Sequence, residues 1–246
     1  MHLEEFAEGT TFVHAADPRV KLVVAVAFAI AVATSHSYPA LVPALGLAAV
    51  LAAMARLSPR RLLARLAVVN VFVVLLWLFL PFTFPGSTVF QVGPLAATAE
   101  GIEASALITL RTNAIVLLTI ALLGTTSIFN LVHALRHLRV PDKLVHTFFF
   151  CYRYIAVIHE EYTRLRHAMR VRCFRPRTNL HTYRSYAYLV GMLLIKSYER
   201  SVRIYQAMLC RGFRGEYPTY HHFHLHRRDV VSLATMAVLI GAIAWL

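Results

Sequence analysis

An arginine-centred pattern that occurs twice, thirty-nine positions apart, is the best candidate for specific chemistry in this sequence. The first copy reads Ala168-Met169-Arg170-Val171-Arg172-Cys173-Phe174-Arg175. The second copy reads Ala207-Met208-Leu209-Cys210-Arg211-Gly212-Phe213-Arg214, and five of the eight positions are identical. A guanidinium group is a planar fork of hydrogen-bond donors that suits carboxylate and carbonyl oxygens. The repeat therefore predicts two equivalent docking sites for an acidic or carbonyl-rich surface, centred on Arg172 and Arg211.

The residues that lead into each copy share a spacing of four. The matched positions are Glu160, Arg164, Ala168 and Arg172 in the first copy and Glu199, Arg203, Ala207 and Arg211 in the second. A step of four keeps side chains on one face of an α-helix. We expect ion pairs from Glu160 to Arg164 and from Glu199 to Arg203, each contributing only about a few tenths of a kcal/mol. Such pairs account for a solvated helix face, but they do not account for the shared arginine endings.

Five apolar segments supply the framework that must hold these sites. Of the 246 residues, 58% are hydrophobic and only 15% are charged, which is typical of a chain that lies largely in lipid. The segments span residues 20–34, 38–55, 66–84, 105–126 and 230–246. Each approaches the ~20 residues that cross a ~30 Å hydrocarbon core. The sequence predicts an all-α integral membrane protein of about five transmembrane helices, with Arg111 of the fourth segment snorkelling or packed against polar neighbours.

The distribution of positive charge predicts the orientation. The net charge is +13, and 18 of the 25 lysines and arginines lie between residues 136 and 228, whereas loops 35–37 and 85–104 contain none. By the positive-inside rule, the N-terminus and the basic region are cytoplasmic and the C-terminus is outside. We expect a four-span bundle over 1–127, a cytoplasmic region over 128–229 and a last transmembrane helix over 230–246. The acidic start, without a cleavage site, predicts no removable targeting segment.

Two long amphipathic helices are expected within the basic region. Apolar stretches at 144–158 and 189–195 lie among its arginines, as in helices at a membrane interface. Pro141 suits the first turn of the first helix, which we expect to reach Phe174. The second helix is expected from about Tyr186 to Arg211, because Gly212 is a typical C-terminal stop. Each copy of the repeat would then end a helix.

These features together resemble the transmembrane T components of energy-coupling factor transporters, a branch of the ATP-binding cassette transporters, and above all their cobalt and nickel members of the CbiQ type. The residues that carry the resemblance are Asp17-Pro18-Arg19-Val20-Lys21-Leu22, Pro141, Tyr152-Arg153-Tyr154-Ile155, Glu160-Glu161, Glu199-Arg200 and Ala207-Met208-x-x-Arg211-Gly212-Phe213. In that family, two cytoplasmic coupling helices each end in an Ala-Arg-Gly motif. By position, the motifs here are Val171-Arg172-Cys173 and Cys210-Arg211-Gly212. Both lack the alanine, and the first also lacks the glycine.

The resemblance implies a scaffold with no catalytic site of its own. Each motif, with Ala168 and Met169 or Ala207 and Met208 in the preceding turn, would dock in a groove of one of two ATPase subunits. Those subunits would bind ATP and Mg, and this chain would bind no cofactor. ATP-driven motion would reorient a separate membrane-embedded S component, which selects the substrate, in a prokaryotic inner membrane. Cobalt or nickel is the implied cargo, and a T component that serves vitamin-type S components is the alternative.

Catalysis and nucleic-acid binding have weaker support. An intramembrane metallohydrolase would use Glu160, Glu161 and the two groups of histidines described below, but no His-Glu-x-x-His motif is present. None of the three lysines follows a glycine, as the lysine of a Walker A loop does, so ATP hydrolysis is expected in partners. The arginines of the basic region alternate with apolar residues and follow the positive-inside pattern, which disfavours nucleic acid as a ligand.

Two groups of histidines have spacings that invite a metal hypothesis, because imidazole is a common ligand of Co, Ni and Zn. His133 and His137 are four residues apart but have no third ligand nearby in the sequence. The other group comprises His221, His222, His224 and His226. It lies on the expected cytoplasmic side, whereas an importer first meets its ion outside. Interfacial packing is the favoured interpretation of this group, with a transient inner metal site as the alternative, and we predict no resident metal.

Overall fold

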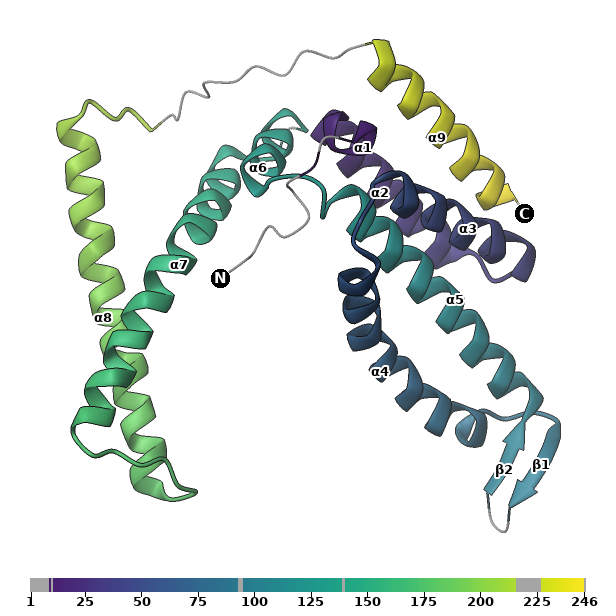
Figure 1. The fold of residues 1–246 in the computed structure, drawn as a ribbon, viewed down its shortest axis with the longest axis horizontal. Helices are drawn as coiled ribbons and strands as arrows, with labels where there is room; N and C mark the ends of the chain where they lie inside the picture. The colour runs from purple at the N-terminus through teal and green to yellow at the C-terminus, as the bar shows by residue number, and fades with distance from the viewer. Residues whose placement is uncertain (1–8, 10, 93–94, 139, 216–226, 246) are drawn as a thin grey trace. The chain divides into compact units, whose positions relative to one another are not determined.

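Helices and one short hairpin make up the described part of the chain (Figure 1). The structure is a computed structural model that describes residues 9, 11–92, 95–138, 140–215 and 227–245. These residues form two compact units, of which one contains α7 and α8 and the other contains the remaining helices and the hairpin. The predicted helical fold class is confirmed, and the hairpin is an addition to it.

The larger unit has a core of closely packed apolar helices. Its contributors are α2 (Pro18–Thr34), α3 (Tyr38–Met54), α5 (Ala99–Leu122) and α9 (Arg227–Trp245). Ala40, Ala44 and Ala48 recur at helical spacing on α3, and Ala114 and Ala121 lie on α5; all five are fully buried. Small side chains let helix backbones approach closely, which increases van der Waals contact where lipid removes the hydrophobic driving force between helices. The alanines therefore set the spacing within this bundle.

Two helices of the described part, α4 (Pro59–Thr83) and α5, have the length and hydropathy to cross a membrane. They meet through polar side chains. The amides of Asn70 and Asn113 exchange hydrogen bonds of 3.1 and 3.0 Å, and Trp77 Nε1 donates to Thr109 Oγ1 at 2.9 Å. An unpaired amide in hydrocarbon is costly, so reciprocal pairing is the arrangement that a lipid environment favours. That α2, α3 and α9 also span the membrane stays a prediction.

A β-hairpin lies between α4 and α5, where the sequence predicted only a loop. β1 (Thr88–Val92) pairs with β2 (Leu95–Thr98) in antiparallel register, with Thr88 opposite Thr98. The Thr98 hydroxyl accepts from the Gly101 N–H of α5 and donates to the carbonyl oxygens of Pro81 and Phe84 at the end of α4, at 3.2 and 2.9 Å. One side chain thus joins two helix ends that would otherwise leave main-chain groups unpaired.

Two basic side chains connect other helix ends of this unit. Arg111 Nη2 donates to the Ser35 carbonyl oxygen, at the C-cap of α2, over 2.6 Å. This contact confirms that Arg111 packs against a polar neighbour. Lys21, only 3% exposed, places Nζ 3.1 Å from Thr126 Oγ1 and 3.5 Å from Thr125 Oγ1. The threonines precede α6 (Ile128–His137), a helix that, like the one-turn α1 (Phe12–Ala15), the sequence analysis did not predict.

The smaller unit consists of two long helices that run in opposite directions, α7 (Asp142–Val171) and α8 (Leu180–Cys210) (Figure 1). Their 30 and 31 residues correspond to about 45 Å each. Two predicted boundaries are wrong. α7 ends three residues before Phe174, because the chain turns at Cys173. α8 begins six residues before Tyr186, because the Asn179 side chain caps it by accepting from the Thr182 N–H at 2.9 Å.

We predict that Gly101→Ala lowers the thermal stability of the chain. A Cβ at this position would lie 2.8 Å from Pro81 Cα and 2.9 Å from the Leu80 carbonyl oxygen, which are backbone atoms of α4 that cannot rotate aside. Gly46→Ala on α3 is the matched control, because a Cβ there meets nothing within 4 Å and alanine is the better helix former. Unfolding in detergent should show a lower midpoint for Gly101→Ala and an unchanged or higher one for Gly46→Ala. Equal midpoints would contradict this close contact of α4 and α5.

Candidate docking site on two helix ends

The first copy of the sequence repeat closes α7 with a Schellman-type turn. Arg172 is the cap residue, and Cys173 follows it with φ of 59°, in the left-handed region. The Phe174 N–H donates to the Met169 carbonyl at 3.1 Å, and the Cys173 N–H donates to the Arg170 carbonyl at 2.9 Å. These bonds satisfy carbonyl groups that the last helical turn leaves unpaired. The cap is built from backbone alone, so it does not use the arginine side chain.

The second copy closes α8 with the same turn. Arg211 is the cap residue, and Gly212 follows it with φ of 78°. The Phe213 N–H donates to the Met208 carbonyl at 3.1 Å, and the Gly212 N–H donates to the Leu209 carbonyl at 3.0 Å. The repeat in sequence is therefore a repeat in backbone structure. The expectation that each copy ends a helix is confirmed.

The left-handed residue explains what the missing glycine changes in the first motif. Glycine adopts this conformation without steric cost, whereas an L-residue pays about 1–2 kcal/mol. Gly212 meets the requirement directly. Cys173 adopts the same backbone shape with a side chain attached, so the first turn keeps its geometry at lower intrinsic stability.

The side chains around both caps lie open to their surroundings. Arg172, Arg211 and the thiols of Cys173 and Cys210 are exposed. Val171, next to the first cap arginine, is 83% exposed, which is unusual for an apolar residue on a helix. In the preceding turns, the exposed residues are Ala168 and Ala207 and the half-buried ones are Met169 and Met208. Exposed apolar and guanidinium groups side by side are a composition typical of protein contact surfaces.

A hollow of about 860 Å³ opens beside the first cap, between the end of α7 and the start of α8. Its lining residues include three arginines, Arg172, Arg175 and Arg177, and one histidine, His181. Phe174 packs edge-on against the Tyr186 ring, with centroids 5.9 Å apart, and holds the loop that carries these arginines. The residues that line the hollow include no carboxylate. This end of the helix pair therefore presents a positive surface that complements an acidic partner.

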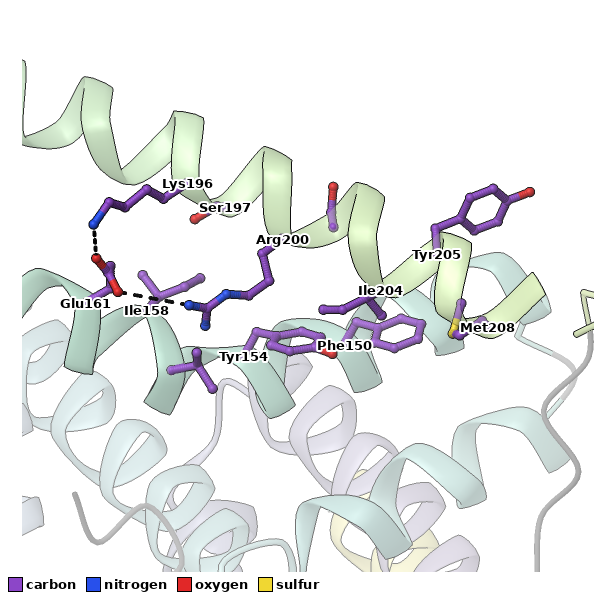
Figure 2. Close-up of a pocket in the computed structure, with 12 residues that line it drawn as sticks. Phe150, Tyr154, Ile158, Glu161, Lys196, Ser197, Arg200, Ile204, Tyr205 and Met208 are labelled. Carbon is purple, nitrogen blue, oxygen red and sulfur yellow. Dashed lines mark hydrogen bonds and ion pairs between the residues drawn. The ribbon is translucent and has the colours of Figure 1, made fainter. Parts of the chain in front are cut away.

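One carboxylate holds α7 and α8 together where they approach each other (Figure 2). The Glu161 side chain, 13% exposed, accepts a hydrogen bond from Lys196 and lies 4.0 Å from a guanidinium nitrogen of both Arg164 and Arg200. The hydrogen bond from Lys196 and the three positive charges lower the pKa of the Glu161 carboxyl, although partial loss of hydration opposes them. Glu161, for which the sequence predicted no ion pair, is therefore the principal polar contact between the two helices.

The predicted ion pairs are half right. Arg203 lies 4.0 Å from Glu199, as expected. Arg164 instead reaches Glu161, three residues earlier, so Glu160 is wrong as its partner. The physical reason is that Glu161 faces α8 and gathers cations from both helices, whereas Glu160 is exposed.

The histidines form no metal site within the residues that the structure describes, where no group of three or more ligating side chains occurs. His133 and His137 of α6 pack edge to face, with ring centroids 4.9 Å apart. The cluster from His221 to His226 lies outside the described residues.

The larger unit is a bundle of apolar helices with paired polar groups, and α4 and α5 have the length and hydropathy to cross a membrane. This arrangement fits a helical membrane protein. The sequence profile of the cobalt transport protein family CbiQ matches residues 9–221. The chain therefore belongs to this family, the CbiQ-type T components of energy-coupling factor transporters. Members of this class are membrane components of transporters and not enzymes.

Three relatives illustrate the range of similarity. The nickel permease LarQ of Lactiplantibacillus plantarum is 30% identical over 115 residues, which cover 47% of this chain and 41% of LarQ. The cobalt transport protein CbiQ of Rhodobacter capsulatus is 27% identical over 128 residues, or 51% of this chain and 52% of the relative. The energy-coupling factor transporter transmembrane protein EcfT of Brevibacillus brevis is 23% identical over an alignment of 256 residues with its gaps. This alignment covers 98% of this chain and 96% of the relative. The chain thus spans less than half of the nickel permease and nearly all of this EcfT.

We predict that Cys173→Gly slows amide hydrogen exchange at the end of α7, and that Gly212→Ala accelerates it at the end of α8. The first change removes and the second introduces a Cβ in a left-handed residue, each worth about 1 kcal/mol of local stability. Cys173→Ser is the control, because serine keeps the Cβ and the strain. Mass spectrometry of the exchanged peptides provides the measurement. Protection in Cys173→Ser equal to that in Cys173→Gly would assign the effect to the thiol and not to the backbone.

We also predict that Glu161→Gln loosens the contact of α7 with α8, while Glu160→Gln does not. Spin labels on Cys151 and Cys210 in a Cys173→Ser chain report the distance between the helices by double electron–electron resonance. The distribution of distances between the two spin labels should broaden in Glu161→Gln and stay unchanged in Glu160→Gln. Only the first change removes the negative charge that Lys196 and two arginines share. Since the pKa of Glu161 is lowered from 4.5, its contribution is complete at neutral pH and is lost as the pH falls below that value. Broadening in the Glu160→Gln chain would refute the assignment.

Proposed function

We propose that this chain is the coupling scaffold of an energy-coupling factor importer, in which the ends of α7 and α8 dock on two ATPase subunits. The observation that carries the proposal is the match of the two caps. Two helices of one unit end in the same backbone turn and place an arginine at the same step of it. Two equivalent turns suit a pair of ATPases, and the same turn at both ends is not required for folding, since helices end in many ways.

The proposed topology places both docking ends on the side of the ATPases. The helices α2, α3, α4, α5 and α9 would span the membrane, with the N-terminus in the cytoplasm. The basic residues between 136 and 228 and the absence of lysine and arginine from 35–37 and 85–104 support this orientation. The hairpin of β1 and β2 would then lie outside, and α7 and α8 would lie at the cytoplasmic face.

The proposed partners follow from the division of labour in such a complex. The ATPases bind ATP and Mg, and a membrane-embedded S component selects the substrate. Cobalt or nickel is the proposed cargo, supported by the description of the family and by the relatives named nickel permease and cobalt transport protein. A scaffold for other S components, vitamin carriers among them, is the second candidate. It is supported by the EcfT relatives, which align over 98% and 86% of this chain and whose names specify no metal.

The test is affinity purification of the tagged chain from membranes, followed by mass spectrometry. Arg172→Ala combined with Arg211→Ala should abolish co-purification of the ATPases and ATP-dependent uptake of labelled cobalt or nickel, while membrane insertion stays intact. Each guanidinium would lose charge-assisted hydrogen bonds to its groove, each worth about 1.5–3 kcal/mol. The matched control is Arg164→Ala with Arg203→Ala, which removes two charges from the same helices two turns before the caps.

Three outcomes separate the possibilities. ATPases lost from the cap variant but kept by the control support docking at the caps. ATPases retained by the cap variant, with full uptake, refute it. An S component that co-purifies with the wild type identifies the cargo class, and one that carries a vitamin would overturn cobalt and nickel without affecting the docking proposal.

A further inference from the structure

A groove between α7 and α8 has the composition of a lipid site. It has a volume of about 370 Å³, within the range of about 300–1,000 Å³ that small-molecule sites occupy. Phe150, Tyr154 and Ile158 line it from α7, and Ile204 and Met208 line it from α8 (Figure 2). Its walls are thus mainly aromatic and aliphatic, with Ser197, Ser201 and Tyr205 as further lining residues from α8, and they belong to one compact unit.

The charged side chains of the groove lie at one end. Glu161, Lys196 and Arg200 gather there, and the apolar residues extend away from them along both helices (Figure 2). From Lys196 to Met208 is twelve residues, or about 18 Å along α8. We therefore expect a ligand that fills this groove to be long and largely apolar, with its charged group at one end.

The charges at the polar end are not balanced. Glu161 is the one acidic residue that lines the groove, and it is shared by Lys196, Arg200 and the nearby Arg164, which leaves two positive charges in excess. Arg200 lies 4.0 Å from the carboxylate, beyond the ~2.7–3.2 Å of a hydrogen bond. Its guanidinium group, 35% exposed, therefore retains donors for a second anion. Phosphate oxygens suit those donors.

We propose that the groove binds one anionic phospholipid, with an acyl chain between the two helices and the phosphate at Arg200 and Lys196. The proposal rests on the proposed function only for the placement of α7 and α8 at the cytoplasmic face, where anionic lipids are available. Such a lipid covers apolar walls that water would otherwise contact and neutralises the excess charge beside Glu161. The bound lipid also holds α7 and α8, the two helices that carry the docking ends, at a fixed distance from each other.

The experiment places a fluorescent reporter in the groove of the full chain. Trp77 and Trp245 are replaced by Phe, Ile204 is replaced by Trp, and the chain is reconstituted in nanodiscs of phosphatidylcholine that contain a minor fraction of acyl-brominated lipid. Brominated phosphatidylglycerol should quench the reporter at about fivefold lower mole fraction than brominated phosphatidylcholine, since one basic residue contributes about that factor to anionic lipid binding. Arg200→Gln should abolish the preference.

Arg203→Gln is the matched control. It also removes one positive charge from α8, three residues after Arg200, but the Arg203 side chain does not line the groove. It should leave the preference intact. Equal quenching by the two lipids in the parent chain overturns the proposal. So does an equal loss in the two arginine variants, which would indicate general surface attraction. Absence of quenching by either lipid also overturns it and indicates that protein fills the groove.

A second measurement avoids the reporter substitution. Native mass spectrometry of the otherwise unchanged chain, released from detergent, should show one retained phosphatidylglycerol that Arg200→Gln loses and Arg203→Gln keeps. Retention by both variants contradicts the site. The ATPases are absent from both experiments, so failure of cap docking leaves their results unaffected, and failure of lipid binding leaves the purification test of Arg172 and Arg211 unaffected.

Discussion

The structure depends on one constraint, which is that the main-chain groups at helix ends must find partners where water is scarce. In the larger unit some of these partners come from other parts of the chain. Thr98 connects the end of α4 to the start of α5, and Arg111 donates to the Ser35 carbonyl at the C-cap of α2. Each cap is therefore also a contact that decides which helices are neighbours. In α7 and α8 the chain solves the same problem locally, with a left-handed turn made of backbone alone. That difference leaves the cap arginines available for contacts outside the chain.

The two caps are equal in backbone and unequal in surroundings. The sequence predicted equivalent sites, and the hydrogen-bond pattern supports that equivalence for the main chain. Yet the first turn carries Cys173 in a conformation that glycine adopts more readily, and it adjoins a hollow that also contains Arg175 and Arg177. A partner that meets the end of α7 therefore finds a more strained turn in a strongly positive setting. Two ATPases bound through the proposed sites would not be held with the same affinity, even if they were copies of one polypeptide.

Much of the helical framework follows from sequence because its signals are local. Long apolar runs locate α2, α3 and α4, although α4 begins at Pro59 and not at residue 66, and the repeat locates the ends of α7 and α8. The hairpin was missed because its apolar residues lie between two spans and carry no helical period. The sequence also could not predict that Glu161, and not Glu160, faces α8. Adjacent residues on a helix point about 100° apart, and only the rotation of α7 against α8 decides which of the two carboxylates meets Lys196. The hydrogen bonds of Thr98 to the end of α4 could not be predicted for the same reason, because they depend on how α4 and α5 pack.

The contacts within each unit differ in a way that matters for transmitting force. The larger unit is packed through buried alanines, a close contact that resists change in helix angle. The smaller unit has a polar contact at Glu161, with a groove and not a packed core on one side of it. Arg172 lies eleven residues beyond Glu161, or about 16 Å, and Arg211 lies fifteen residues beyond Lys196, or about 22 Å. Displacement of either cap thus acts on that contact through a long rigid helix. In the proposed function, α7 and α8 are the compliant element and the alanine-packed bundle is the fixed one, because a narrow ionic contact permits rotation that interlocked side chains do not.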